Sequence, residues 1–221
     1  IKFLNKNKNE ILIIHLITFL PLMLKFLFNF KINTILRISG YPKLNIFRKS
    51  IWKYSDRNLK FITCPSVDLL NQIKKTKIFN SQKILFLPDA IININNIKKN
   101  LSARIEKEDK KIILAAGRFT KQKNFLYLLD EFEKFLKIKK KYKLVILGDG
   151  EKRIEIEKFV KKKNISSYVQ LKGRVKDVFN YMKNSDLFVL SSLWEDPGFV
   201  IIEAAYSNLF VVSSNCPNGP K

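Results

Sequence analysis

The second half of this sequence alternates short apolar runs with longer amphipathic segments, and this alternation constrains the fold more than any other feature. The short runs carry few polar residues, as expected of strands that are buried on both faces. The longer segments repeat apolar residues at helical spacing. Because strands that alternate with helices build βαβ units, the sequence predicts an α/β fold with a parallel sheet. The predicted strands are Ile112–Ala116, Leu144–Leu147, Val169–Leu171, Leu187–Leu190 and Leu209–Val212.

The helical pattern is clearest between Asn124 and Lys140, where apolar residues recur every three or four positions and Lys and Glu occupy the other face. Open parallel sheets bind ligands beyond the carboxyl ends of their strands. Gly117-Arg118 and Glu195 both follow predicted strands, so we expect them at the same edge of the sheet.

Two carboxylates, Glu195 and Glu203, flank an Asp196-Pro197-Gly198 sequence. Pro fixes its own φ and Gly accepts φ values that other residues avoid, so this sequence is predicted to separate a strand from a helix. One carboxylate is then expected on the loop and the other in the first turns of the helix. The free backbone N–H groups at the helix start, between the two acids, attract negatively charged or hydroxyl-rich ligands.

The spacing of this pair, Glu, seven residues and Glu followed by Ala, resembles the signature of retaining glycosyltransferases of the GT-B type, family 4-like (glycosyl transferases group 1). Four upstream segments resemble the same family in order and spacing, and ordered matches are far more specific than a lone pair of carboxylates. The resemblance implies two Rossmann-like domains with parallel sheets, both incomplete in this chain. The four segments are 112–125, with Gly117-Arg118 and Lys123-Asn124, then Leu147–Gly150, Val169–Val175 and Asp186–Ser192.

The first half of the chain is predicted to belong to a separate domain, with strands at Ile11–Ile14, Thr34–Ile38 and Phe61–Cys64 and a helix over Leu20–Phe30. Its segments 15–22, 36–45 and 62–66 resemble members of the family that assemble bacterial polysaccharide and lipopolysaccharide. We interpret residues 1–95 as the carboxyl-terminal part of the amino-terminal, acceptor-side domain. Residues 96–110, rich in Asn and Lys, are the predicted linker, and 111–221 the amino-terminal part of the nucleotide-sugar-binding domain. The chain lacks a starting Met and ends in an expected loop, so we interpret it as a fragment.

The formal net charge of +23 raises the question of an anionic partner. Lys, Asn and Ile are over-used throughout the chain and no nucleic-acid-binding module is recognisable, so we expect no nucleic-acid partner. A basic surplus still attracts anionic lipid, and an anionic membrane surface stays an open expectation.

The two cysteines, Cys64 and Cys216, fall in different predicted domains, which indicates a reducing, cytoplasmic compartment. The apolar stretch Ile11–Phe30 contains too many polar or helix-breaking residues for a membrane span, among them Pro21 and Lys25. We therefore expect a cytoplasmic protein, peripheral at the inner face of the cytoplasmic membrane if it contacts lipid.

Arg118 and Lys123 are the candidate groups for a donor diphosphate. Cleaving the bond between a sugar and a nucleoside diphosphate builds negative charge on the departing phosphate, and cations aimed at that charge lower the barrier. Arg118 carries a planar fork suited to phosphate oxygens and Lys123 a mobile point charge. Composition alone would make them two of 42 surface cations. Their position after a predicted strand, and the resemblance, favour a catalytic role.

By resemblance, Glu203 holds the ribose hydroxyls of the donor and Glu195 the donor sugar, in a catalytic role. Carboxylates accept hydrogen bonds from hydroxyl groups well. The alternative is that Glu203 is an acid favoured by the helix dipole and Glu195 a solvated loop acid. The remaining donor contacts are backbone groups of Gly198, Phe199 and Val200, and of Val175 if the turn 172–175 faces the nucleotide base. The sequence reads Asp-Pro-Gly-Phe where many relatives have Pro-Phe-Gly-Leu.

His15 and Arg37 follow or end strands of the first domain and are candidates for the acceptor side, with structural roles as the alternative. Gly148-Asp149-Gly150 lacks the spacing of a dinucleotide fingerprint and is predicted to be a strand-to-helix turn. No metal-ligand spacing is present, so we expect no metal and no cofactor other than the nucleoside-diphosphate sugar as co-substrate.

Taken together, these features predict a metal-independent enzyme that moves a sugar from a nucleoside diphosphate to a glycan or lipid-linked acceptor, with retention, in cell-surface polysaccharide synthesis. Two alternatives stay open. One is a non-catalytic subunit that keeps the fold, and the other is a sugar-phosphate synthase or phosphorylase on the same fold.

Overall fold

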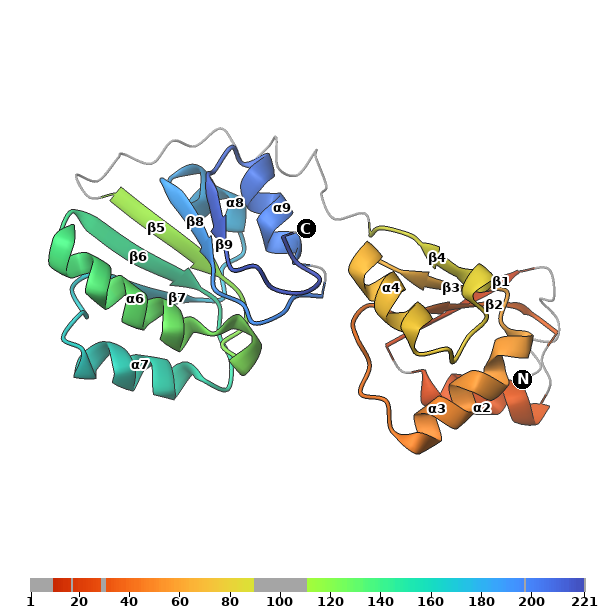
Figure 1. The fold of residues 1–221 in the computed structure, drawn as a ribbon. Helices are drawn as coiled ribbons and strands as arrows, with labels where there is room; N and C mark the ends of the chain where they lie inside the picture. The colour runs from red at the N-terminus through yellow and green to blue at the C-terminus, as the bar shows by residue number, and fades with distance from the viewer. Residues whose placement is uncertain (1–9, 17, 29–30, 90–110, 197, 221) are drawn as a thin grey trace. The chain divides into compact units, whose positions relative to one another are not determined.

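The computed structural model describes residues 10–16, 18–28, 31–89, 111–196 and 198–220. They form two compact α/β units, Ile1–Ala90 and Ile91–Lys221, each with its own parallel sheet (Figure 1). The α/β class with two parallel sheets that the sequence predicts is therefore confirmed. The predicted linker at 96–110 lies outside the described residues.

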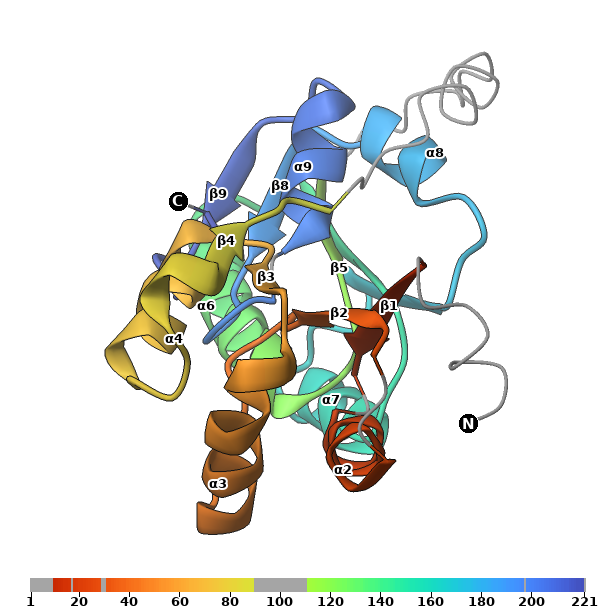
Figure 2. The same cartoon turned by 90° about the vertical axis from the view of Figure 1, so that its right-hand side faces the viewer.

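The first unit is a four-stranded parallel sheet in which each strand pairs with the next one along the chain, as can be followed in Figure 2. Because successive crossovers in one direction place their helices on one face, side chains of all three helices share one buried cluster, for example Leu22, Trp52 and Leu69. The elements are β1 (Ile11–His15), α2 (Phe19–Phe28), β2 (Asn33–Arg37), α3 (Ile46–Ser55), β3 (Phe61–Cys64), α4 (Val67–Lys75) and β4 (Ile84–Phe86).

Two helices of this unit begin at side-chain caps. The Asn45 carboxamide oxygen accepts from the Arg48 N–H at the start of α3, and the Ser66 hydroxyl accepts from the Leu69 N–H at the start of α4. Asn and Ser favour these positions because they satisfy backbone donors that the helix leaves free. The apolar stretch from Ile11 contributes β1 and α2, and no helix in the described part of the chain is both long and apolar enough to cross a membrane.

The second unit is a five-stranded parallel sheet with the order β7-β6-β5-β8-β9. All five predicted strands are confirmed with shifts of at most two residues at their ends, and the predicted helix at 124–140 is confirmed as α6. The elements are β5 (Lys111–Ala116), the short 3₁₀-helix η3 (Lys121–Lys123), α6 (Phe125–Ile138), β6 (Tyr142–Leu147), α7 (Arg153–Lys162), β7 (Val169–Gly173), α8 (Val178–Lys183), β8 (Leu187–Leu190), α9 (Phe199–Tyr206) and β9 (Val211–Ser213).

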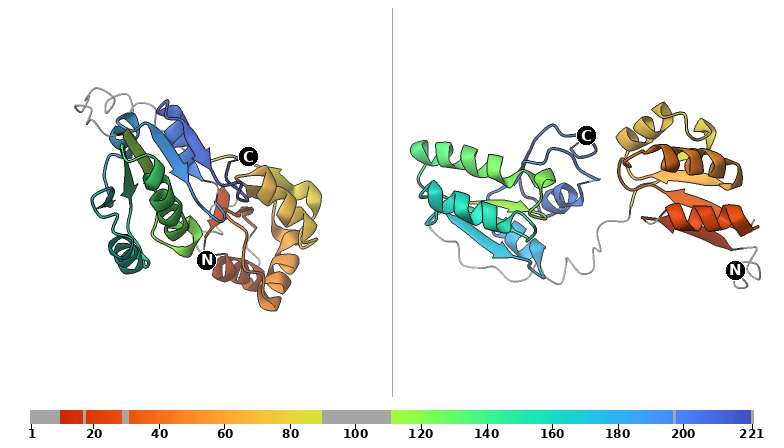
Figure 3. Two further views of the ribbon diagram at one scale, coloured as in Figure 1. Left: turned by 60° about the vertical axis from the view of Figure 1, so that its left-hand side comes forward. Right: turned by 90° about the horizontal axis from the view of Figure 1, so that it is seen from below.

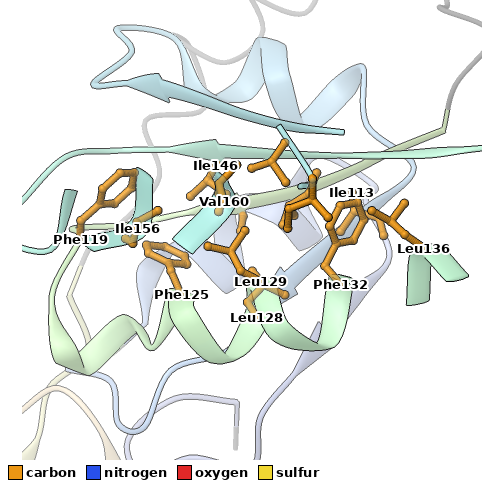
Figure 4. Packing of buried hydrophobic residues seen from close by; sticks show 14 residues of the cluster. Ile113, Phe119, Phe125, Leu128, Leu129, Phe132, Leu136, Ile146, Ile156 and Val160 are labelled. Carbon is orange, nitrogen blue, oxygen red and sulfur yellow. The ribbon is translucent and has the colours of Figure 1, made fainter. Parts of the chain in front are cut away.

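Alternate residues of the central strand β5 separate the two faces of this sheet. Ile113 and Ala115 pack with α6 and α7, whereas Leu114 and Ala116 pack with α8 and α9. The two helical layers can be followed in Figures 1 and 3, and Figure 4 shows Phe125, Leu129 and Phe132 of α6 directed at the strands. Burial on both faces explains why the strands are continuous apolar runs.

The last predicted strand is present, but it begins two residues later and ends one residue later than expected. The expectation was Leu209–Val212, but β9 covers Val211–Ser213. The Leu209 N–H donates to the Ala204 carbonyl, and Asn208 adopts a left-handed conformation with φ 60°, so both residues form the cap that follows α9. Asn is one of the few residues that enters this conformation easily, and it commonly ends a helix.

The strand order creates a switch point between the neighbouring interior strands β5 and β8. From β5 the chain proceeds through α6 to β6 on one side, and β8 pairs with β5 on the other side. Helices therefore leave the neighbouring strands β5 and β8 toward opposite faces, and open α/β sheets bind ligands beyond the carboxyl ends of strands at such a switch point. The segments that follow these two strands carry the candidate donor residues.

Candidate functional site

The switch point is occupied by a buried ion pair between Lys123 and Glu195. Lys123 ends η3 after β5, and Glu195 lies on the loop after β8. The Lys123 Nζ is 2.6 Å from the Glu195 Oε1, and the two side chains are only 13% and 4% exposed. Two residues that are far apart in the sequence thus form one charged unit. The sequence predicted both as donor residues but did not predict that they pair.

A buried ion pair is stable only when further hydrogen bonds compensate for lost hydration. The Ser192 hydroxyl supplies one, donating to the same Glu195 Oε1 at 2.5 Å. The backbone N–H of Glu195 donates to the Pro217 carbonyl at 2.9 Å. Glu195 is therefore not the solvated loop acid of the alternative interpretation, because the fold encloses it.

Gly198 and the segment after β9 close around this carboxylate. Gly198 precedes the first residue of α9 with φ 76°, as the Asp-Pro-Gly sequence predicts. A Cβ at Gly198 would lie 3.2 Å from the Glu195 Cγ, so any other residue here would combine a tight contact with a strained backbone angle. Cys216 and Glu195 both lie next to Gly219, where an added Cβ would meet the Cys216 Sγ at 3.0 Å and the Glu195 Cγ at 3.2 Å. Burial, with a smaller contribution from the Glu195 charge, raises the pKa of the Cys216 thiol. This thiol is a poor nucleophile as a result.

Unlike Lys123, Arg118 forms no ion pair with any of the described residues. It follows β5 immediately after Gly117 and is exposed, and its guanidinium has no partner among the described residues. The neighbouring loop is anchored by the Gly117 N–H, which donates to the Leu147 carbonyl, and by the Phe119 N–H, which donates to the Asp149 carbonyl. An unpaired guanidinium on an anchored loop at a switch point is suited to a phosphate ligand.

Glu203 lies on α9 and is partly buried, with no donor to its carboxylate among the described residues. Burial raises its pKa above the ordinary value of 4.5. A carboxylate that loses hydration and gains no donor destabilises the protein, and such groups concentrate at functional sites. The sequence placed this residue correctly in the first turns of the helix.

We expect Glu203→Gln to stabilise the protein at neutral pH while weakening nucleotide binding. The raised pKa means that the folded state binds this proton more tightly than the unfolded chain. The stability cost is therefore present at neutral pH, above the raised pKa, and disappears as the pH falls below about 4.5. Thermal unfolding should show a higher Tm for the variant at pH 7 and a smaller difference at pH 4.

Glu151→Gln is the matched control, because Glu151 is an exposed acid of the same unit. It should change neither Tm nor nucleotide binding. A Glu203→Gln variant that is less stable than the wild type at pH 7 would show that the carboxylate is stabilised by contacts and is not held for a ligand.

The other predicted donor residues offer backbone groups rather than side chains. The side chains of Val175 and Val200 pack against the buried cluster beneath α8 and α9, so neither side chain is free to bind a ligand. Gly198, Phe199 and Val200 begin α9, where backbone N–H groups lack partners within the helix. Gly148-Asp149-Gly150 connects β6 to α7 and is confirmed as a strand-to-helix turn.

The structure places His15 and Arg37 in the first unit, at the carboxyl edge of its sheet, where they are register partners on β1 and β2. His15 is exposed and its Nε2 hydrogen-bonds to the Ser39 hydroxyl. Arg37 is buried, and its guanidinium donates to the Leu87 carbonyl and the Asp89 carboxylate, each at 2.5 Å. These contacts give Arg37 a structural function within its unit, and an acceptor contact by either residue stays a prediction.

Sequence reasoning missed several residues that build the site. Gln122 holds the loop before Glu195 at two points, since its carbonyl accepts from the Leu193 N–H and its side chain donates to the Trp194 carbonyl. Ser191 and Ser192 hold Lys123 and Glu195 respectively. The one available signal was the position of the two serines directly after a buried strand.

Comparison with known proteins identifies the family of this chain. The chain matches the sequence profile of the family "Glycosyl transferases group 1" over residues 96–221, more than half of its length. This chain belongs to the group 1 glycosyltransferases. The family membership predicted from the sequence motifs is confirmed, and it covers the whole of the second unit that the structure describes.

Relatives with known names include bacterial and archaeal glycosyltransferases. An uncharacterized glycosyltransferase of Methanocaldococcus jannaschii is 32% identical over 189 residues, which cover 82% of this chain and 45% of the relative. An α-1,4-N-acetyl-D-galactosaminyltransferase of Campylobacter jejuni is 26% identical and covers 86% of this chain and 52% of its own length. The name of the second specifies a GalNAc-containing glycan on PP-undecaprenol. The chain spans about half the length of these relatives.

Solved structures of GT-B glycosyltransferases share the fold. S. aureus TarM, in a complex with UDP, superimposes with a TM-score of 0.76 at 21% identity, over 99% of this chain and 44% of the other. HepE of Anabaena, also with UDP, gives a TM-score of 0.78 at 13% identity, over 98% and 63% of the two chains. At these identities the likeness establishes the GT-B fold of the group 1 enzymes for this chain.

Proposed function

We propose that this chain belongs to an enzyme that transfers a sugar, with retention, from a nucleoside-diphosphate donor to a lipid-linked glycan. The chain contains the donor-binding region and part of the acceptor-side domain of that enzyme. The observation that carries the proposal is the buried Lys123–Glu195 pair at the switch point, together with Arg118, which follows β5 and has no partner for its guanidinium among the described residues. Retention is proposed on the likeness of the Glu195–Glu203 spacing to retaining enzymes.

The cations have separate functions in this proposal. Arg118 binds the diphosphate oxygens through its free fork. Lys123 uses one of its three N–H groups on Glu195, so the other two remain for the diphosphate. Lys123 then contacts both Glu195, which holds the donor sugar, and the diphosphate, which is the leaving group. Charge that develops on the leaving group is met by cations already in place, without a metal ion.

The acids bind the two ends of the donor. Glu203 accepts from the ribose hydroxyls, which supply the hydrogen-bond donors that its carboxylate lacks among the described residues. Glu195 accepts from a hydroxyl of the donor sugar. The proposed donor is a UDP-sugar, supported by the UDP complexes of TarM and HepE, and the proposed acceptor is an undecaprenol diphosphate-linked glycan, supported by the Campylobacter jejuni relative.

The test is donor turnover by the full-length protein, measured as UDP release from UDP-glucose, UDP-N-acetylglucosamine and UDP-N-acetylgalactosamine with a PP-undecaprenol-linked glycan. We expect turnover with at least one donor, and a loss of about 10²-fold in kcat/KM for Arg118→Ala, since one pre-organised donor is worth about 3 kcal/mol. Lys161→Ala, which removes an exposed cation of the same unit, should change nothing. A wild type that turns over none of these donors would favour the non-catalytic alternative.

We also propose that the enzyme works at an anionic membrane surface, supported by the +23 charge and by exposed apolar side chains of α2, such as Leu20 and Leu27. The same assay with acceptor in anionic and in neutral vesicles tests this contact. Anionic vesicles should give more protein-bound lipid and faster turnover at low salt, and the advantage should vanish at high salt. Equal behaviour on both vesicle types would exclude electrostatic attachment.

A further inference from the structure

The Glu195 carboxylate receives two donors on one oxygen. Lys123 Nζ and Ser192 Oγ both donate to Oε1, at 2.6 Å and 2.5 Å. The two donors differ in rigidity, because a lysine ammonium ends a long flexible stem whereas a serine hydroxyl turns about a single side-chain torsion. Ser192 is only 2% exposed and stands two residues beyond the end of β8. Ser192 is therefore the donor that sets the position of Oε1.

The sheet in turn holds Ser192. The Ser214 hydroxyl donates to the Ser192 carbonyl at 2.6 Å, and the Ser214 N–H donates to the Leu190 carbonyl at 2.8 Å. These bonds extend the pairing of β8 with β9 up to the site. The neighbouring Ser191 hydroxyl donates to the Lys123 carbonyl at 2.8 Å and fixes the other half of the ion pair.

We infer that Ser192 is a positioning residue for sugar transfer, which orients the Glu195 carboxylate so that its second oxygen, Oε2, accepts from a hydroxyl of the donor sugar. A serine hydroxyl has a single proton, so its bond to Oε1 leaves Oε2 without competition from Ser192. Without Ser192, the carboxylate is held at Oε1 by the flexible Lys123 alone and rotates more freely. The inference rests on the proposed function of Glu195 and adds the group that gives this acid its geometry.

The test compares Ser192→Ala, Ser192→Thr and Glu195→Gln in the full-length protein with the UDP-sugar that gives the fastest turnover. A hydrogen bond to a charged group is worth about 1.5–3 kcal/mol, so Ser192→Ala should lower kcat about 10- to 100-fold. UDP affinity, measured by calorimetry, should stay within about twofold, because UDP lacks the sugar. Ser192→Thr keeps the hydroxyl and should retain more activity than Ser192→Ala.

Ser185→Ala is the matched control, since the Ser185 hydroxyl makes a similar bond to the Tyr181 carbonyl at 2.7 Å, before β8 rather than after it. It should leave both kcat and UDP affinity unchanged. A double-mutant cycle separates positioning from structure. If Ser192 acts through Glu195, then adding Ser192→Ala to Glu195→Gln should lower kcat no further.

Three results would overturn the inference. They are an unchanged kcat in Ser192→Ala, a loss of UDP affinity as large as the loss of kcat, and full additivity with Glu195→Gln. Failure of the proposed function looks different, because the wild type itself would then neither turn over nor bind any UDP-sugar.

Discussion

Lys123→Met should remove most sugar transfer and also destabilise the second unit. Its ammonium is the charge partner of Glu195 at 2.6 Å, and both side chains are largely buried. Removing one partner of a buried pair leaves the other charge uncompensated, which costs about 3–5 kcal/mol of unfolding free energy. Loss of a pre-organised cation at the leaving group should cost about 10²- to 10³-fold in kcat. Urea unfolding and UDP release measure the two effects.

The double variant Lys123→Met/Glu195→Gln separates stability from chemistry. Neutralising Glu195 removes the uncompensated charge, so most of the lost stability should return while activity stays absent. Lys163→Met is the control, because Lys163 pairs with Asp130 at a similar 2.8 Å but with both side chains about one-third exposed. It should cost less than about 1 kcal/mol and leave activity intact. Equal stability losses in Lys123→Met and Lys163→Met would contradict the prediction that burial makes the Lys123–Glu195 pair more costly to break than the exposed Lys163–Asp130 pair.

Gly148→Ala should disrupt the site from a distance, with the largest effect on stability of any single methyl addition that we predict. A Cβ at Gly148 would lie 1.9 Å from the Gly117 carbonyl oxygen, and the φ of Gly148 is +132°. The backbone that carries Arg118 would have to move, because the obstructing atom is main chain and cannot rotate away. We expect a loss of about 4 kcal/mol or more, together with weakened UDP binding.

Gly173→Ala is the matched control for this prediction. Gly173 also has a positive φ, +70°, but its Cβ would meet only the Arg153 Nη1 at 3.8 Å. The cost should be limited to the backbone strain, about 1–2 kcal/mol. Denaturant unfolding of both variants, with UDP calorimetry, provides the comparison. Similar losses in the two variants would show that the contact with Gly117 is unimportant.

The local sequence pattern was sufficient to predict the strands of the second unit and helix α6, and to identify the segments that carry the candidate site. Strands buried on both faces are recognisable as continuous apolar runs, and α6 as an amphipathic repeat, because burial acts on each residue separately. The glycine before α9 was likewise predictable, because glycine accepts the positive φ that Gly198 adopts there. The exact start of β9 was not, because Leu209 opens an apolar run that continues to Val212 while its N–H donates to the Ala204 carbonyl of α9.

Periodicity and motif spacing in the sequence thus determined the α/β class, the family and the segments around Arg118, Lys123, Glu195 and Glu203. Only the tertiary structure decided that the carboxyl ends of β5 and β8 are neighbours, and hence that Lys123 and Glu195 form a buried pair. It also decided that Ser192 shares the same carboxylate oxygen and that Arg37 bonds within its own unit. The physical reason is that strand order and side-chain pairing arise from contacts between distant segments, whereas periodicity reports only how each segment is buried.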